Sequence, residues 1–311
     1  MSTLLLRIQP VFQEKIWGGE RLRTVFRYDL PGDHIGECWA ISGHPNGDCT
    51  ILNPEFRGMM LGTLWNTRRD LFGYRKDAAF PLLVKIIDAK EDLSVQVHPD
   101  DSYAMRHENG SLGKTECWYV LDCDPDATIV YGHNARTREE MERMIRENRW
   151  NELLREVPVR KGDFFQVDPG CIHALKAGTL ILETQQSSDV TYRLYDYGRL
   201  QDGKPRRLHI EKSLDVATIP HRTGKIRQKT AVIGDARVTR LIRCPFYTVY
   251  RMELDGFTRM TWEQDFVNMS ILSGSGVIDG EPVKTGDHLI VPARYGQMTI
   301  EGTMELICSH P

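Results

Sequence analysis

The amino-acid sequence predicts an all-β protein with a few short helices. Most of the chain consists of short segments of about four to eight residues, rich in Val, Ile, Tyr, Phe and Trp, which end at Gly, Pro, Asn or Asp; residues 81–87 and 127–132 are examples. Short strands at close intervals are typical of a β-sandwich or a β-barrel. Because 311 residues are enough for roughly two domains, we expect two such units.

An internal repeat indicates that the two units are similar barrels. Residues 161–170 and 284–293 each contain Gly-Asp, a strand of about four residues, and Pro followed by a small residue. This pattern predicts a tight turn, a strand that closes one side of a barrel, and a Pro-led turn at the barrel mouth. His173 follows the first copy, whereas Gly296 stands at the matching place after the second. The second barrel is therefore expected to lack this ligand-type side chain.

Three segments carry helical patterns instead. The clearest begins at a capping box, in which Thr137 precedes Glu140 by three residues, and continues along an apolar face toward Leu154. A second, uneven helix is expected over residues 54–72, and a third over residues 210–217. The helices are therefore predicted as additions to a β framework.

The domain boundary is expected in an irregular stretch near residue 225. Between residues 209 and 240 the chain becomes basic and poor in strand patterns. We predict a metal-binding catalytic barrel over residues 1–225, and a degenerate barrel without metal ligands over residues 226–311.

The bulk composition excludes several kinds of partner. Hydrophobic residues make up 41% of the chain, but no apolar run approaches the ~20 residues of a membrane helix. Positive and negative residues alternate with a net charge of −3, so we expect no nucleic-acid partner. The short apolar stretch at residues 4–6 lacks the features of a secretory signal, and the seven cysteines include no Cys-x-x-Cys pair. We therefore expect a cytoplasmic protein with reduced thiols and no membrane partner.

Four potential metal ligands lie in segments that are predicted to be strands or turns between strands. Gln96 and His98 alternate along one strand and so point to the same face, while Glu116 and His173 follow in later segments. Two imidazoles, a carboxylate and an amide oxygen form a set of N and O donors that suits zinc, manganese, iron or cobalt. Each histidine alone would more often be a turn or core residue, but together the four residues favour a metal site.

Two neighbouring residues are excluded from this site. Cys171 lies two residues before His173, and we expect it to be a buried core thiol. The segment Glu37-Cys38-Trp39 resembles Glu116-Cys117-Trp118, but it lacks a lysine two residues before the glutamate. Glu37 is therefore expected to be solvated or paired, not bound to the metal.

Two lysines and one further glutamate are additional candidates. Lys114 shares a strand face with Glu116, which places its ammonium near the metal, where it can bind substrate or exchange protons. Lys85 stands alone in an apolar run, and a lysine in such a place usually has an anionic partner. Glu183 shares a face with Gln185, and the pair either supports the site or belongs to an ordinary barrel wall.

The combination of these motifs resembles class I mannose-6-phosphate isomerases, and by length the short bacterial form of that family. The matching segments are Ile16-Trp17-Gly18-Gly19, Gly36-Glu37-Cys38-Trp39, Gln96-Val97-His98-Pro99, Lys114-x-Glu116, Pro169-x3-His173-Ala174-Leu175 and residues 183–197. The resemblance implies a cupin-type double β-barrel of jelly-roll type and a zinc-dependent enzyme that interconverts mannose 6-phosphate and fructose 6-phosphate. It places Gln96, His98, Glu116 and His173 at metal-binding positions, although some short relatives carry another residue at the position of Gln96.

The implied reaction suggests roles for the remaining candidates. Aldose–ketose isomerisation needs a base that moves a proton between neighbouring carbons, and a cation that stabilises the enediolate. Arg193 is permanently charged and fits the second role. Asp189 shares a strand face with Arg193, so we expect it to orient Arg193 or to act as an acid–base group. Arg193, Lys114 and Asp189 are thus the predicted catalytic residues, and Lys85 and Glu183 the predicted substrate-binding residues.

Two alternatives remain open at this point. Two histidines and one carboxylate are also how mononuclear iron oxygenases bind their metal. A non-catalytic sugar-binding cupin is the other alternative. The expected partner is a phosphorylated hexose, and the chain is expected to be a monomer or a homodimer.

Overall fold

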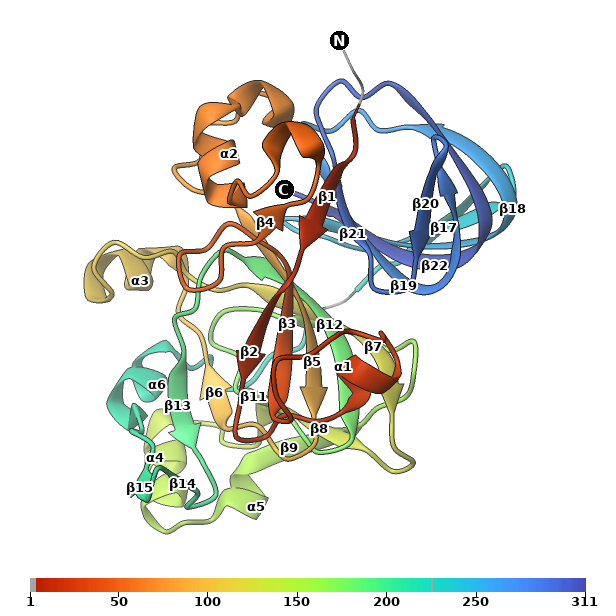
Figure 1. Cartoon of the computed structure of the whole chain (residues 1–311). Coiled ribbons are helices and arrows are strands. Elements are labelled where there is room, and N and C mark those ends of the chain that lie inside the picture. Colours follow the sequence, from red (N-terminus) through yellow and green to blue (C-terminus); the bar gives the residue numbers. More distant parts are fainter. Residues whose placement is uncertain (1–3, 225) are drawn as a thin grey trace.

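A computed structural model describes residues 4–224 and 226–311 and contains two β-barrels, which confirms the predicted fold class (Figure 1). The second barrel lies at the upper right of Figure 1 and the first below it. None of the helices in the described part of the chain is long and apolar enough to cross a membrane. All seven cysteines are free thiols, as predicted.

Two facing sheets form the first barrel. The six-stranded sheet has the order β10 (Phe164–Val167), β7 (Glu116–Cys123), β12 (Thr179–Gln186), β5 (Leu82–Ala89), β3 (Ile35–Ser42), β2 (Val11–Glu14). The five-stranded sheet has the order β13 (Tyr192–Tyr195), β6 (Val95–Val97), β11 (His173–Leu175), β8 (Thr128–His133), β9 (Leu154–Pro158). Side chains from both sheets, among them Ile87, Trp118 and Leu175, fill the space between them.

A nine-stranded sheet forms the second barrel. Its order is β16 (Lys229–Ile233), β17 (Ala236–Arg243), β18 (Thr248–Thr261), β22 (Gln297–His310), β19 (Val267–Ile278), β21 (His288–Val291), β1 (Leu6–Gln9), β4 (Thr50–Ile51), and β20 (Glu281–Lys284) pairs with β19. Its interior is apolar and includes Met269, Ile271, Leu289 and Leu306.

The N-terminal segment contributes to both barrels. Strand β1 pairs antiparallel with β21, with Ile8 opposite His288, whereas β2 pairs with β3 of the first barrel. In Figure 1 the two strands follow each other from the upper barrel to the lower one. A single cut at 225/226 therefore places β1 and β4 with the first barrel, although both strands belong to the sheet of the second. The division at 225/226 remains a prediction, and residues 1–3 and 225 lie outside the described residues.

The helices lie where the sequence predicted them, with two short additions. Their bounds are α1 (Arg21–Thr24), η1 (Pro54–Phe56), α2 (Leu61–Thr67), η2 (Arg69–Phe72), α3 (Asp101–His107), α4 (Arg138–Arg146), α5 (Trp150–Leu153) and α6 (Ile210–Val216), of which α1 and α3 were not predicted. Thr137 caps α4 by accepting a hydrogen bond from the Glu140 amide at 3.2 Å. Asp100 caps α3 in the same way, a signal that could have been found in the sequence.

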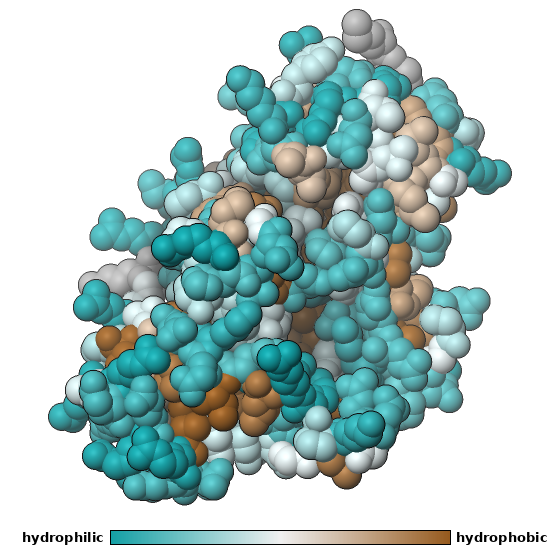
Figure 2. All heavy atoms as spheres, turned by 90° about the vertical axis from the view of Figure 1, so that its left-hand side faces the viewer, coloured by the Kyte–Doolittle hydropathy of each residue, from teal (hydrophilic) through white to brown (hydrophobic). Residues whose placement is uncertain are grey.

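The helices of the first barrel cover the outer face of its five-stranded sheet. Apolar residues of α4, α5 and α6, such as Met141, Trp150 and Leu214, pack against Val95 and Val130 of that sheet. Figure 2 shows the side of the molecule that carries α3 and α6, and this side is mainly hydrophilic. Hydrophobic atoms gather in its lower part. In Figure 1 this is the level of α4 and of the hairpin formed by β14 (Leu200–Gln201) and β15 (Lys204–Pro205). The opposite face of this sheet is left free to line the barrel interior.

The repeated Gly-Asp turns have the same geometry, which supports the internal duplication. Gly162 and Gly286 have φ angles of +90° and +89°, which glycine adopts easily. The Asp163 carboxylate accepts a hydrogen bond from the Arg160 amide at 2.8 Å, and the Asp287 carboxylate accepts the equivalent bond from Lys284 at 2.9 Å. The two barrels thus share this turn, although the segments that follow it differ.

Candidate active site

Three of the four predicted metal ligands converge in the first barrel. His98 follows β6, Glu116 begins β7 and His173 begins β11, and all three side chains are buried. The Glu116 carboxylate lies 3.4 Å from His98 Nε2 and 3.2 Å from His173 Nε2. One ligand atom of each residue lies within 4.8 Å of the others, so the group can hold a single metal ion.

Both imidazoles are oriented by backbone carbonyls. His98 Nδ1 lies 2.9 Å from the Val190 oxygen, and His173 Nδ1 lies 2.9 Å from the Cys171 oxygen. Because a carbonyl only accepts hydrogen bonds, each Nδ1 carries the proton and each Nε2 presents a lone pair. Both Nε2 atoms and Glu116 Oε1 are buried without a hydrogen-bond partner. These orphaned atoms fit a divalent cation, which would satisfy all of them at once.

The protonation states of the ligands also suit a cation. Burial lowers the pKa of His98 to about 3, and the neighbouring Lys114 contributes to this shift. Burial alone would raise the pKa of Glu116, but Lys114 and His98 hold it well below its ordinary value. His98 is therefore a neutral imidazole and Glu116 an ionised carboxylate, the forms that bind metals.

Gln96 lies beside this group but is placed differently. In the sheet it stands opposite His173 on β11 and opposite Arg193 on β13. Directly opposed residues share a face, so the three side chains form a row across the three strands. Gln96 is half-buried and lines a cavity. Its role as fourth ligand remains a prediction.

A cavity of about 350 Å³ opens beside the three buried ligands. Its lining contains six residues that the sequence predicted: Lys85, Gln96, Lys114, Glu183, Asp189 and Arg193. Sequence reasoning missed several polar and aromatic residues of the same lining, among them Lys15, Trp17, Glu37, Trp39, Asn46 and Arg206. The early Ile16-Trp17-Gly18-Gly19 and Glu37-Cys38-Trp39 segments were the available signals for these residues.

Lys114 forms an ion pair with the carboxylate of the candidate metal ligand Glu116. Its Nζ lies 2.8 Å from Glu116 Oε2. Burial alone would lower the pKa of Lys114, but the charges of Glu116 and Glu183 raise it above its ordinary value. The ammonium is therefore charged, and it can donate hydrogen bonds to a substrate oxygen.

Asp189 does not orient Arg193, and that part of the prediction is wrong. Asp189 is exposed; it accepts a hydrogen bond from Asn46 and lies 3.7 Å from His44 Nε2. Within the described residues no ion pair joins it to Arg193, because the chain between the two residues turns into β13 at the cavity margin. Arg193 instead donates a hydrogen bond to the Arg207 carbonyl at 2.9 Å, and its buried Nε has no partner.

A cluster of arginines surrounds this end of the cavity. Asp196 accepts hydrogen bonds from Arg199 and Arg206, both at 2.7 Å. Burial, followed by the charge of Arg206, lowers the pKa of Arg193 from its ordinary value, but a guanidinium remains charged at neutral pH. Three guanidinium groups face one carboxylate, so this end of the cavity carries an excess of positive charge.

The opposite wall holds a buried lysine between two carboxylates. Lys85 Nζ lies 3.4 Å from Glu183 Oε1 and 3.9 Å from Glu37 Oε2. This agrees with the expectation that Lys85 has an anionic partner. Glu37 is paired with Lys85 and Lys15, which agrees with the expectation that it is solvated or paired.

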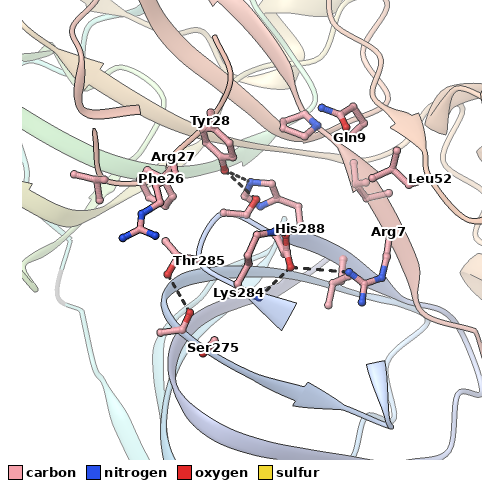
Figure 3. A pocket seen from close by; sticks show the side chains of 17 residues that line it. Arg7, Gln9, Phe26, Arg27, Tyr28, Leu52, Ser275, Lys284, Thr285 and His288 are labelled. Atoms are coloured by element: carbon pink, nitrogen blue, oxygen red, sulfur yellow. Dashed lines mark hydrogen bonds and ion pairs between the residues drawn. The ribbon is translucent and has the colours of Figure 1, made fainter. Parts of the chain in front are cut away.

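A second cavity, of about 540 Å³, lies where β1 and the loop after α1 meet the second barrel (Figure 3). At its base the Tyr28 hydroxyl lies 2.7 Å from His288 Nε2, and His288 Nδ1 lies 2.9 Å from the Ser270 hydroxyl. Among the described residues that line it, no buried side-chain N or O atom lacks a hydrogen-bond partner. This larger cavity therefore lacks the unsatisfied groups that mark the smaller one.

Comparisons with known proteins agree with this architecture. Residues 5–122 match the model described as phosphomannose isomerase type I, catalytic domain, and residues 237–311 match the mannose-6-phosphate isomerase, cupin domain. Mannose-6-phosphate isomerase ManA of Bacillus subtilis (strain 168) is 47% identical over 315 residues, which cover 100% of both chains. The mannose-6-phosphate isomerase of Streptococcus mutans is 46% identical over 313 residues, or 98% of each chain.

Solved structures show the same relationship. The crystal structure of mannose 6-phosphate isomerase from Bacillus subtilis has a TM-score of 0.97 at 45% identity and covers 99% of both chains. A putative mannosephosphate isomerase from Archaeoglobus fulgidus, at 20% identity and a TM-score of 0.77, shares the fold.

A double barrel with a cupin domain and a buried His-Glu-His group beside a charged cavity defines a cupin protein with a candidate metal centre. More narrowly, the chain belongs to the type I phosphomannose isomerase family, which confirms the resemblance found in its motifs.

Proposed function

We propose that this protein is a metal-dependent isomerase that interconverts mannose 6-phosphate and fructose 6-phosphate. Family membership supports the reaction, since its full-length relatives carry that name at 45–47% identity. The observation that carries the metal dependence is the group of buried, unpartnered ligand atoms of His98, Glu116 and His173 beside a cavity that is large enough for a small sugar. The full-length relatives named as isomerases argue against an iron oxygenase. The charged side chains that line the cavity beside the unpartnered ligand atoms argue against a non-catalytic sugar-binding protein.

Zinc is the cofactor that we propose. His98, Glu116 and His173 would hold it, and Gln96 is the candidate for a fourth position. Three firm protein ligands without a thiolate are typical of a catalytic rather than a structural zinc site. When bound, the ion would supply a Lewis acid that polarises the oxygens of the substrate.

The residues of the chain would then perform the proton transfer. Arg193 presents a guanidinium with a buried, unpartnered Nε to the cavity, and it stabilises the enediolate oxygen as negative charge develops. Lys114 donates a hydrogen bond to a substrate oxygen next to the Glu116 carboxylate. Asp189 remains a candidate acid–base group at the open margin, because its exposed carboxylate can exchange protons with water.

The phosphate group would bind at the arginine end of the cavity. Arg206 lines it, and Arg199 shares Asp196 with Arg206, which leaves Arg193 for the enediolate. Guanidinium groups match phosphate oxygens in geometry and charge. This arrangement directs the reacting carbons of the sugar toward Lys114 and the metal ligands. For location and assembly we propose the cytoplasm and a monomer or homodimer, on the sequence composition alone.

A coupled assay tests the proposal. Purified protein loaded with zinc should form fructose 6-phosphate from mannose 6-phosphate, a chelator should abolish the activity, and added zinc should restore it. No turnover by the zinc-loaded protein would contradict the reaction. Oxygen uptake by iron-loaded protein would favour the oxygenase alternative instead.

A further inference from the structure

Lys85 is held in the first barrel by a row of residues from four neighbouring strands. Trp39 on β3 stands opposite Lys85 on β5, and Lys85 stands opposite Glu183 on β12, which in turn stands opposite Trp118 on β7. Directly opposed residues point to the same face of a sheet, so the four side chains lie next to one another. Lys85 Nζ also lies 5.1 Å from the centre of the Trp39 ring, in the range of a cation–π interaction.

Each carboxylate beside Lys85 is fixed by an indole. Trp39 Nε1 donates a hydrogen bond to Glu37 Oε2 at 2.7 Å, and Trp118 Nε1 donates one to Glu183 Oε2 at 2.9 Å. The fixed carboxylates then contact Lys85 from two sides, and Lys15 lies 3.5 Å from the other oxygen of Glu37. Side chains this well constrained hold an ammonium in one place.

The similar segments around Trp39 and Trp118 therefore serve different purposes. Trp39 bonds to Glu37 two residues before it in the same strand. Trp118 cannot do the same, because Glu116 is turned toward His98 and His173, and it bonds to Glu183 of the adjacent strand instead. The similarity in sequence thus produces one glutamate for the metal centre and one for Lys85.

The charge balance indicates what this arrangement recognises. Lys85 and Lys15 are matched by the two carboxylates, so this wall carries no excess of positive charge, and a phosphate group placed here would be repelled by Glu37 and Glu183. An uncharged hydroxyl faces no such repulsion, because it can accept a hydrogen bond from the ammonium and donate one to a carboxylate. Glu183 Oε1 is buried without a hydrogen-bond partner and is available as that acceptor.

We infer that Glu37, fixed by Trp39, is a positioning residue that holds Lys85 for recognition of a sugar hydroxyl in the cavity. This inference rests on the proposed isomerase function. It assigns hydroxyl recognition to the wall formed by Glu37, Lys85 and Glu183, and leaves phosphate binding to the arginine end. Burial alone would raise the pKa of Glu37, but Lys85 and Lys15 lower it, so the carboxylate is charged in this role.

The variant Glu37→Gln tests the inference, since the amide oxygen can still accept the Trp39 hydrogen bond while the charge on Lys85's partner is lost. We expect KM for mannose 6-phosphate to rise about tenfold, as when one charged hydrogen bond to a ligand is weakened. The inhibition constant of inorganic phosphate and the zinc content should stay within about twofold of wild type, because neither site contacts Glu37. Exposed Glu55, on η1, provides the matched control Glu55→Gln, which should leave all three values unchanged.

Two results would overturn the inference. One is an unchanged KM in Glu37→Gln, and the other is an inhibition constant for phosphate that rises as much as KM, which would make this wall part of the phosphate site. If Glu37→Gln fails to fold, Trp39→Phe serves in its place, with a smaller expected rise in KM and the same two contrary results. Failure of the proposed function is distinguishable, because the wild-type protein itself would then show no turnover.

Discussion

The two barrels share a turn and a strand pattern, but their buried histidines differ in whether both ring nitrogens have hydrogen-bond partners. In the first barrel His98 and His173 each use Nδ1 for a backbone carbonyl and leave Nε2 without a partner. In the second barrel, His288 on β21 is equally buried, yet Tyr28 and Ser270 satisfy both of its nitrogens. Burial of a histidine therefore does not by itself indicate a metal site. The better indication is a ring nitrogen whose lone pair the protein orients but leaves without a hydrogen bond.

The cavities repeat this contrast. The larger cavity, shown in Figure 3, has no unpartnered buried polar side-chain atom among its described lining residues. The smaller one adjoins the orphaned atoms of His98, Glu116 and His173 and includes the unpartnered Arg193 Nε. Of these two cavities, the one with the greater volume is therefore not the one beside the candidate metal centre.

Substitution of one histidine in each barrel tests the difference between them, and it has the largest expected effect. His98→Ala removes a ligand atom, so we expect loss of bound zinc and a fall in kcat/KM of about a thousandfold or more. The matched control is His288→Gln, which should keep both the zinc and the activity within a few-fold. Metal analysis of the purified variants and the coupled assay measure both quantities. Retention of zinc and activity by His98→Ala would contradict the assignment of His98 as a metal ligand.

A change at Arg193 separates metal binding from turnover within the first barrel. Arg193→Ala leaves the ligand group intact, so zinc content should equal that of wild type, while kcat should fall about a hundredfold to a thousandfold. Arg237 on β17 is largely exposed, and Arg237→Ala provides the control, with wild-type kcat expected. Wild-type turnover in Arg193→Ala would refute the role assigned to this guanidinium.

The smallest effect concerns stability and sharpens the role of His288. Burial lowers the pKa of His288 to about 4, with Asp287 opposing the shift. The unfolded chain, with a histidine pKa near 6.5, takes up this proton at higher pH than the folded chain does, so the free energy of unfolding should decrease as pH falls from about 6.5 to about 4. The contribution is at most about 3 kcal/mol. His288→Gln should show a shallower decrease in urea unfolding across this range, and an identical slope would contradict the assignment.

Much of the metal site could be predicted because its signals are local. Alternation along residues 93–99 and the turn before His173 place the ligands without knowledge of distant contacts. By contrast, the pairing of β1 with β21 joins opposite ends of the chain, and no local pattern reveals it. The network around Lys85 depends on the cross-strand register of β3, β5 and β12, including an irregularity after Trp39. Asp189 was misassigned in part because β13 begins only at Tyr192, so Asp189 does not alternate with Arg193 along one strand.

The central claim is that one of the two barrels, the first, holds a catalytic metal ion. Titration of zinc into chelator-stripped wild-type protein, followed by calorimetry, tests it most directly. We expect saturable binding of one zinc ion per chain, recovery of isomerase activity in proportion to occupancy, and loss of this binding in His98→Ala but not in His288→Gln. Full turnover by the stripped protein, or a second equivalent of zinc that His288→Gln removes, would contradict the account.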